Sequence, residues 1–251
     1  MKNPVKAKLK AGEVSLGCWV SIGHQDISER LANIGFDWLT FDMEHAPLDR
    51  ETVQFMIQSM SYQNDCVPIV RVPWNEIWMV KHVLDIGAYG VVIPLIGTKA
   101  DAVKAVSYCK YPPEGVRGCA PRHAAFRDKD YIQTINDEVL TVVQIETEEA
   151  VRNIDEICSV KGVDVCFIGP TDLSLSLGIL GQTKHPRFEK AKQRIVGACK
   201  KWGVAPGMFC NTEDVTGAIK EGFQFISVAS DLDHLLSGAK AALNRAKDYA
   251  K

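Results

Sequence analysis

Two hydrophobic patterns alternate along this chain. Short, continuous apolar runs rich in β-branched residues occur at 16–21, 38–42, 67–71, 90–94, 140–145, 163–168, 204–209 and 225–229. Uninterrupted runs of this length are typical of strands covered on both faces, as in parallel sheets. Between them, apolar residues recur at helical spacing, as in 50–60, 76–87 and 99–109. A further helix is predicted to open at an Asp26 N-cap and to end at Gly35.

This alternation predicts the fold class. Eight strand–helix units in 251 residues favour a (β/α)8 TIM barrel. A doubly wound open sheet is the alternative, but no GxGxxG motif follows an early strand. No Ser/Gly-rich linker divides the chain, so we expect a single α/β domain over residues 1–251. One connection is long, at 110–139, and a long connection in a compact domain usually serves a function or covers a site.

Composition limits the classes of binding partner and the cellular compartment that we expect. The net charge is −2, and Lys and Arg are scattered, so we expect no nucleic-acid partner. The chain has no apolar run near the roughly 18 residues that a membrane span needs, and no secretory signal is evident at its start. None of the eight cysteines forms a CxxC pair, and most lie within apolar segments. They are interpreted as reduced, mostly buried thiols of a cytoplasmic protein.

Polar residues follow the predicted strands at the ends where barrel enzymes place their chemistry. Asp42 ends the second strand, and Arg71 ends the third. Such groups lie far apart in sequence, but a barrel would bring them to one face. The strand-end side chains are Trp19, Asp42, Glu44, His45, Arg71, Gln144, Glu146 and Asp172.

Each candidate has a functional and a structural interpretation. Glu146 and Asp172 would repel each other on adjacent strands unless a cation lay between them, and Mg²⁺ takes one or two carboxylates. Both also precede helical segments, so the residues alone leave helix capping open. Arg71 suits a substrate carboxylate or a structural ion pair equally. His45 suits a general base, a metal ligand or a solvated loop, with Asp42, Glu44 or Asp85 as its partner.

Several motifs together resemble the HpcH/HpaI aldolase family of metal-dependent (class II) pyruvate aldolases. These include 4-hydroxy-2-oxoheptanedioate aldolase and 2-dehydro-3-deoxyglucarate aldolase. The likeness covers nearly the whole chain. It includes "GFDWLTFDMEHAP" (35–47), "VRVPWNE" (70–76), "LDIGAYGVVIP" (84–94), "YPPEGVRG" (111–118), "VQIET" (143–147) and "FIGPTDLSLSLG" (167–178).

The resemblance implies a (β/α)8 barrel that assembles as a homo-oligomer, a hexamer or another trimer-based form, with the C-terminal helix exchanged between neighbours. It implies Glu146 and Asp172 as ligands of a divalent metal, Mg²⁺ or Mn²⁺ in the first place and Co²⁺ or Zn²⁺ as alternatives. His45 would act with a water molecule on the metal, and Asp85 would be its carboxylate partner, often across a subunit boundary. The remaining implied site residues are Arg71 at the keto-acid oxygens, Asp42 and Glu44 in support of the groups that touch the substrate, Gln144 beside the metal, Gly169 and Thr171 at the substrate carboxylate, and Trp19 and Phe209 on the pocket wall.

The implied reaction is reversible retro-aldol cleavage of a 4-hydroxy-2-oxo acid to pyruvate and an aldehyde. Oxaloacetate decarboxylation or CoA-ester cleavage on the same site are alternatives, and a non-catalytic keto-acid-binding barrel is a third. One departure concerns the long connection, where Ala120 stands in place of a glycine that many members carry. Because that connection helps the family bind the aldehyde, the resemblance supports the pyruvate half of the substrate better.

Overall fold

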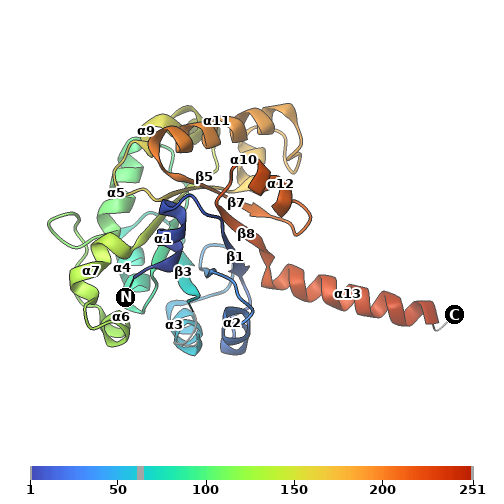
Figure 1. Ribbon diagram of the computed structural model, residues 1–251, viewed down its shortest axis with the longest axis horizontal. Helices are drawn as coiled ribbons and strands as arrows, with labels where there is room; N and C mark the ends of the chain where they lie inside the picture. Colours follow the sequence, from blue (N-terminus) through green and yellow to red (C-terminus); the bar gives the residue numbers. More distant parts are fainter. Residues whose placement is uncertain (1, 61–64, 250–251) are drawn as a thin grey trace.

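The computed structural model describes residues 2–60 and 65–249 and has a closed barrel of parallel strands surrounded by helices (Figure 1). Neighbouring strands pair in sequence order, and the last strand closes on the first. The strands are β1 (Ser15–Val20), β2 (Trp38–Asp42), β3 (Val67–Arg71), β4 (Gly90–Ile93), β5 (Leu140–Ile145), β6 (Val165–Ile168), β7 (Ala205–Cys210) and β8 (Phe225–Ser230). Every predicted apolar run overlaps one of them, so the (β/α)8 fold is confirmed.

Helices follow the strands around the outside. They are α1 (Pro4–Lys10), α2 (Gln25–Ala32), α3 (Arg50–Ser59), α4 (Ile77–Asp85), α5 (Lys99–Cys109), α6 (Arg122–Arg127), α7 (Tyr131–Glu138), α8 (Glu148–Arg152), α9 (Ile154–Cys158), α10 (Pro170–Ser176), α11 (Pro186–Trp202), α12 (Val215–Lys220) and α13 (Asp231–Tyr249). None of those in the described part of the chain is long and apolar enough to cross a membrane.

The predicted boundaries of α2 were wrong at both ends. His24, not Asp26, is the N-cap, and its ring nitrogen accepts a hydrogen bond from the Asp26 N–H at 3.2 Å. Asp26 lies inside the first turn, where a carboxylate also interacts favourably with the helix dipole. The helix ends at Ala32, before Gly35.

Aromatic rings fill the barrel interior. Trp38 of β2 stacks on Phe225 of β8 with centroids 4.1 Å apart. Gly17 makes room for the Trp38 ring, because a Cβ atom at this position would overlap it. Phe167 packs edge-on against Phe225 at 6.0 Å and stacks with Trp19 at 5.3 Å. This continuous packing leads to Trp19 near the carboxyl ends of the strands.

Helix α1 is bound to the amino ends of the strands by ion pairs and hydrogen bonds. The Lys6 ammonium donates to the Asp164 carboxylate at 3.1 Å and to the Val139 carbonyl at 2.7 Å. Lys8 pairs with Asp37 at 2.6 Å. These carboxylates are therefore structural, which leaves the opposite end of the barrel for chemistry.

The long connection at 110–139 carries α6 and α7 and lies at this same amino-terminal end. It follows the end of α5 and leads into the start of β5. Buried Arg117 anchors it by pairing with Asp85, the last residue of α4, at 2.7 Å. The connection therefore lies away from the carboxyl ends of its own barrel.

The C-terminal helix α13 extends away from the barrel (Figure 1). Its first residue, Asp231, is buried, and its carboxylate accepts hydrogen bonds from the backbone N–H groups of Ser21 and Ile22. These bonds fix the start of the helix to the end of β1. Beyond that turn the helix exposes a series of apolar side chains, namely Leu232, Leu235, Leu236, Leu243 and Tyr249. An exposed apolar face of this kind fits contact with another chain.

Candidate active site

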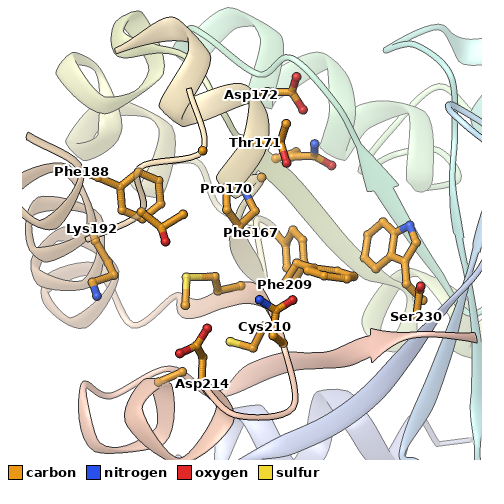
Figure 2. A pocket seen from close by; sticks show the side chains of 18 of the residues that line it. Phe167, Pro170, Thr171, Asp172, Phe188, Lys192, Phe209, Cys210, Asp214 and Ser230 are labelled. Carbon is orange, nitrogen blue, oxygen red and sulfur yellow. The ribbon is translucent and has the colours of Figure 1, made fainter. Parts of the chain in front are cut away.

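A cavity of about 830 Å³ opens at the carboxyl ends of the strands, and Figure 2 shows it from close by. Most of the predicted site residues line it, although they come from six different strands and the segments that follow them. These residues are Trp19, Asp42, His45, Arg71, Gln144, Gly169, Thr171, Asp172 and Phe209. The barrel thus brings together groups that lie up to 190 residues apart in sequence.

Arg71 is held in the cavity by hydrogen bonds and an ion pair. It lies beside Asp42 in the β2–β3 register, and its guanidinium donates from Nε to Asp42 Oδ1 at 2.9 Å and from Nη2 to Oδ2 at 2.6 Å. Nη1 lies 2.9 Å from Glu44 Oε2. Each terminal nitrogen carries two N–H groups, so one on Nη1 and one on Nη2 are left to donate to a bound oxyanion.

Asp42 also shapes the turn that carries His45. Its Oδ1 accepts the backbone N–H of Glu44 at 3.0 Å and that of His45 at 3.2 Å. Burial by itself would raise the pKa of Asp42, but the hydrogen bond and charge of Arg71, with these N–H groups, lower it below its usual value. Asp42 therefore stays ionised and holds both Arg71 and the turn.

The pKa of Glu44 is shifted in the opposite direction. Burial raises the pKa of Glu44 to about 7, because desolvation outweighs the favourable charge of Arg71 and the nearby Glu146 adds repulsion. Two carboxylates from β2 and its turn thus share one guanidinium but differ in protonation near neutral pH. Asp42 is the permanent anion, and Glu44 is the one that titrates.

Glu146 and Asp172 form the predicted metal-ligand pair. Glu146 is buried just below the cavity, where its Oε1 accepts the Leu95 N–H at 2.7 Å and its Oε2 is hydrogen-bonded to the Gln144 amide. Burial, and in smaller part the repulsion of Asp172, raises the pKa of Glu146. A carboxylate that is disfavoured in its charged form gains from a nearby cation.

The donor set fits a divalent cation. Asp172 lines the cavity, and Gln144 Oε1 is buried without a hydrogen-bond partner among the described residues. A side chain at Gly169 would come within 3.0 Å of both Gln144 and Glu146, so glycine keeps this corner open. Two carboxylates with room for water and substrate oxygens match the preference of Mg²⁺.

The capping alternative for these carboxylates was wrong. Thr147, not Glu146, caps α8, and its hydroxyl accepts the Ala150 N–H at 3.1 Å. Gly169 is the N-cap of α10, so Asp172 lies at the third helical position. The backbone N–H groups of Thr171 and Asp172 therefore belong to the first turn of α10 beside the cavity.

Aromatic side chains form the wall next to Arg71. The guanidinium lies 5.0 Å from the centroid of the Trp19 ring, and Phe209 meets Trp19 edge-on at 6.3 Å. A cation over an indole face is attracted by its electrons, and the contact excludes water from one side of Arg71. Phe167 also lines this wall. This residue was not among the site residues predicted from the sequence. Its place two residues before Gly169, on the inward face of β6, was the available signal.

His45 and Asp85 lie at opposite ends of the chain's own barrel. The His45 side chain is 64% exposed at the cavity, and its Nε2 is 3.9 Å from Glu44. Asp85 ends α4, near the start of β4, where it is bound to Arg117. Within one chain, Asp85 therefore does not orient His45. The predicted pairing requires a second copy of the chain.

Leu95 is a site residue that no sequence signal indicated. It follows β4 and adopts a left-handed backbone conformation, with φ of 55°. This conformation is uncommon for a residue with a side chain, and here it accompanies the short N–H bond to Glu146. An exposed leucine after a strand gives no hint of such a contact in sequence.

Comparison with known proteins identifies the family of the chain. The family model of the HpcH/HpaI aldolase/citrate lyase family matches residues 15–238. The hydroxypyruvate/pyruvate aldolase of Paraburkholderia phytofirmans is 38% identical, with 98% of each chain covered. The 5-keto-4-deoxy-D-glucarate aldolase of Shigella boydii is 40% identical, over 92% of this chain and 91% of its own.

A solved structure is similar over the same extent. A HpcH/HpaI aldolase/citrate lyase family protein from Burkholderia cenocepacia superposes with a TM-score of 0.94 at 38% identity, covering 98% of this chain and 100% of its own. The likeness therefore includes the strands and the connections that build the cavity. The chain belongs to the HpcH/HpaI aldolase/citrate lyase family.

Proposed function

We propose that this protein is a divalent-metal-dependent pyruvate aldolase that cleaves 4-hydroxy-2-oxo acids to pyruvate and an aldehyde. One observation carries the proposal. Arg71 is held by two carboxylates and an indole face, with N–H groups left to donate, in the cavity that Asp172 also lines. Such an arrangement suits an oxyanion that develops beside a fixed cation.

The substrate carboxylate and carbonyl belong at this corner. The first turn of α10 offers the Thr171 and Asp172 N–H groups to the carboxylate, a favourable position for an anion. Gln144, with its unpartnered Oε1, lies beneath. Arg71 donates to the oxygen at C2, where negative charge accumulates as the C3–C4 bond breaks. Because Asp42 and Glu44 hold the guanidinium in place beforehand, this stabilisation needs no rearrangement.

Glu146 and Asp172 are proposed to hold the cation. When bound, a divalent cation supplies Lewis acidity to the keto acid, which stabilises the enolate of pyruvate. Mg²⁺ or Mn²⁺ suits an all-oxygen donor set best, with Co²⁺ or Zn²⁺ as alternatives.

His45 is the proposed base. In the cleavage direction it accepts the proton of the C4 hydroxyl, the C3–C4 electron pair enters the enolate, and the aldehyde leaves. C3 then takes a proton to give pyruvate. The side chain is exposed at the cavity mouth, so it can reach a substrate and return its proton to solvent. Asp85 of a second copy is proposed to orient the ring.

Assembly into a homo-oligomer is part of this proposal. The exposed leucines of α13 fit exchange of this helix between copies, as the family resemblance implies. A second copy would then also bring Asp85 and the 110–139 connection near His45. We place the assembly in the cytoplasm, in keeping with buried thiols such as Cys18, Cys109 and Cys210, which form no disulfide in the described part of the chain.

The decisive experiment measures pyruvate release from a panel of 4-hydroxy-2-oxo acids, oxaloacetate and a CoA ester with Mg²⁺, Mn²⁺, Co²⁺ or Zn²⁺. We expect cleavage of at least one hydroxy-oxo acid that stops on chelation. Faster turnover of oxaloacetate or the CoA ester than of every aldol would favour the decarboxylase or lyase alternative. Keto-acid binding without turnover would favour the non-catalytic barrel.

A further inference from the structure

Three cysteines from separate elements meet on the outer side of the barrel, apart from the residues that line the cavity. Cys158 ends α9, Cys166 lies in β6 and Cys199 lies in α11. Because Phe167 packs inside the barrel, its neighbour Cys166 faces outward, toward the helices. Helices α9 and α11 pack against each other there (Figure 1). We call these three residues the cysteine cluster.

The sulfur atoms of the cysteine cluster are spaced like ligands around one ion. All three Sγ atoms lie within 4.8 Å of one another, and those of Cys158 and Cys166 are 3.5 Å apart. With a metal–sulfur bond of about 2.3 Å, two sulfurs on one ion are about 3.5–4 Å apart. A shift of about 1 Å or less would therefore bring all three sulfurs onto a single ion.

Burial of the cysteine cluster favours a complex without net charge. Cys158 is 3% exposed, and Cys166 and Cys199 are fully buried. The same two helices bury the apolar side chains of Ile157 and Ile195. An uncompensated charge in such an apolar layer is costly. Once three thiols have lost their protons, monovalent and divalent ions leave a net negative charge, whereas a trivalent ion leaves none.

The ligand set of the cysteine cluster also restricts the ion. Within residues 2–60 and 65–249, no His, Asp or Glu joins the three sulfurs as a fourth ligand. Asp155 lies one turn earlier in α9, but its carboxylate is bound to Lys201 at 2.7 Å and to Trp202 at 3.3 Å. Structural Zn²⁺ almost always takes four protein ligands, and Mg²⁺ prefers oxygen. Three thiolates alone suit a soft ion that is complete with three sulfurs.

We propose that the cysteine cluster binds one trivalent arsenic through three sulfurs. Arsenous acid, As(OH)₃, supplies it, and each thiol gives its proton to one hydroxyl of the acid. Three S–H and three As–O bonds break, three As–S bonds form, and three water molecules leave. No electron is transferred, and the bound complex carries no net charge. This site is independent of the proposed aldolase function.

A short helix provides access to the cysteine cluster. Helix α9 has 5 residues and ends at Cys158. A helix this short has little stability of its own and depends on its packing. Local opening of α9 would expose the thiols without unfolding the barrel.

Native mass spectrometry of the full chain with arsenite tests the proposal. The protein is first reduced with a phosphine, because a dithiol reductant would compete for arsenic. We expect one adduct per chain, with the mass of one arsenic atom less three hydrogens. An adduct that retains a hydroxyl group would have only two sulfurs and would overturn the three-sulfur site. Absence of any adduct would overturn it as well.

Substitutions locate the site. Cys158→Ser and Cys199→Ala should each weaken arsenite binding at least about tenfold, since even outer-shell partners of a bound ion contribute that much. Cys109→Ala is the matched control, because Cys109 is a fully buried cysteine of α5 outside the cluster. It should bind arsenite like the wild type. Unchanged affinity in the two cluster variants, with native circular dichroism, would overturn the assignment.

Competition with other cations tests the choice of ion. Excess Mg²⁺ or Zn²⁺ should leave the arsenic adduct intact, because neither is complete with three sulfurs. Displacement of arsenic by Zn²⁺ would overturn the preference for a trivalent ion. Pyruvate release, measured separately, reports on the proposed aldolase function and does not enter this test.

Discussion

Replacing Arg71 by lysine keeps the positive charge but removes the planar fork. In the structure, Nε, Nη1 and Nη2 make three contacts of 2.6 to 2.9 Å to Asp42 and Glu44. A lysine has one nitrogen with three N–H groups, so it cannot bridge both carboxylates and still donate twice to a substrate. The variant must therefore lose either contacts to Asp42 and Glu44 or hydrogen bonds to the substrate.

The magnitude follows from these contacts. Hydrogen bonds between charged groups contribute about 1.5–3 kcal/mol each, so losing one should lower the free energy of unfolding by about that amount. Loss of a preorganised oxyanion donor typically lowers kcat by about 10²–10³. We expect both effects in Arg71→Lys, as measured by pyruvate release and by urea unfolding.

Arg152→Lys is the matched control. Arg152 is exposed and lies 3.7 Å from Glu148, so exchanging it should leave activity unchanged and stability within about 0.5 kcal/mol. A kcat for Arg71→Lys within about threefold of wild type, less than 1 kcal/mol in the barrier, would refute the role of the fork.

Further outcomes test the remaining assignments. Glu146→Gln or Asp172→Asn should abolish metal-dependent cleavage while circular dichroism stays native, and full activity after EDTA treatment would contradict a metal role. His45→Ala should lower kcat by about 10²–10⁴, and unchanged cleavage and pyruvate C3 proton exchange would exclude it as the base. Burial raises the pKa of Glu44 to about 7, so the metal-free folded state holds a proton that the unfolded chain releases near 4.5. The free energy of unfolding of the metal-free protein should therefore fall as pH rises between these two values. Added Mg²⁺ should raise Tm more at about pH 8 than at about pH 5. A Mg²⁺ effect that is equal at both pH values would contradict this. Truncation after Ser237 removes most of α13 and should yield a smaller species in analytical ultracentrifugation, whereas an unchanged mass would argue against helix exchange.

The hydrophobic pattern was sufficient for the fold because a buried parallel strand must be apolar on both faces. The apolar runs therefore located β1 to β8 without help from other signals. Their ends then identified Asp42 and Arg71, since every strand of such a barrel points the same way. Helix boundaries were less certain, as α2 shows, because a histidine ring took the capping position expected for Asp26.

Pairing and protonation were decided only by the tertiary structure. In sequence, Arg71 had no visible partner and Glu146 had two open interpretations, because hydrogen bonds depend on register and burial between distant segments. The β2–β3 register placed Asp42 beside Arg71, and burial separated the pKa of Glu44 from that of Asp42. Folding also placed Asp85 with Arg117, away from His45 of the same chain. The sequence by itself thus determined which residues reach the carboxyl end of the barrel. The three-dimensional packing decided which of them touch, which stay charged and how much space remains for a substrate.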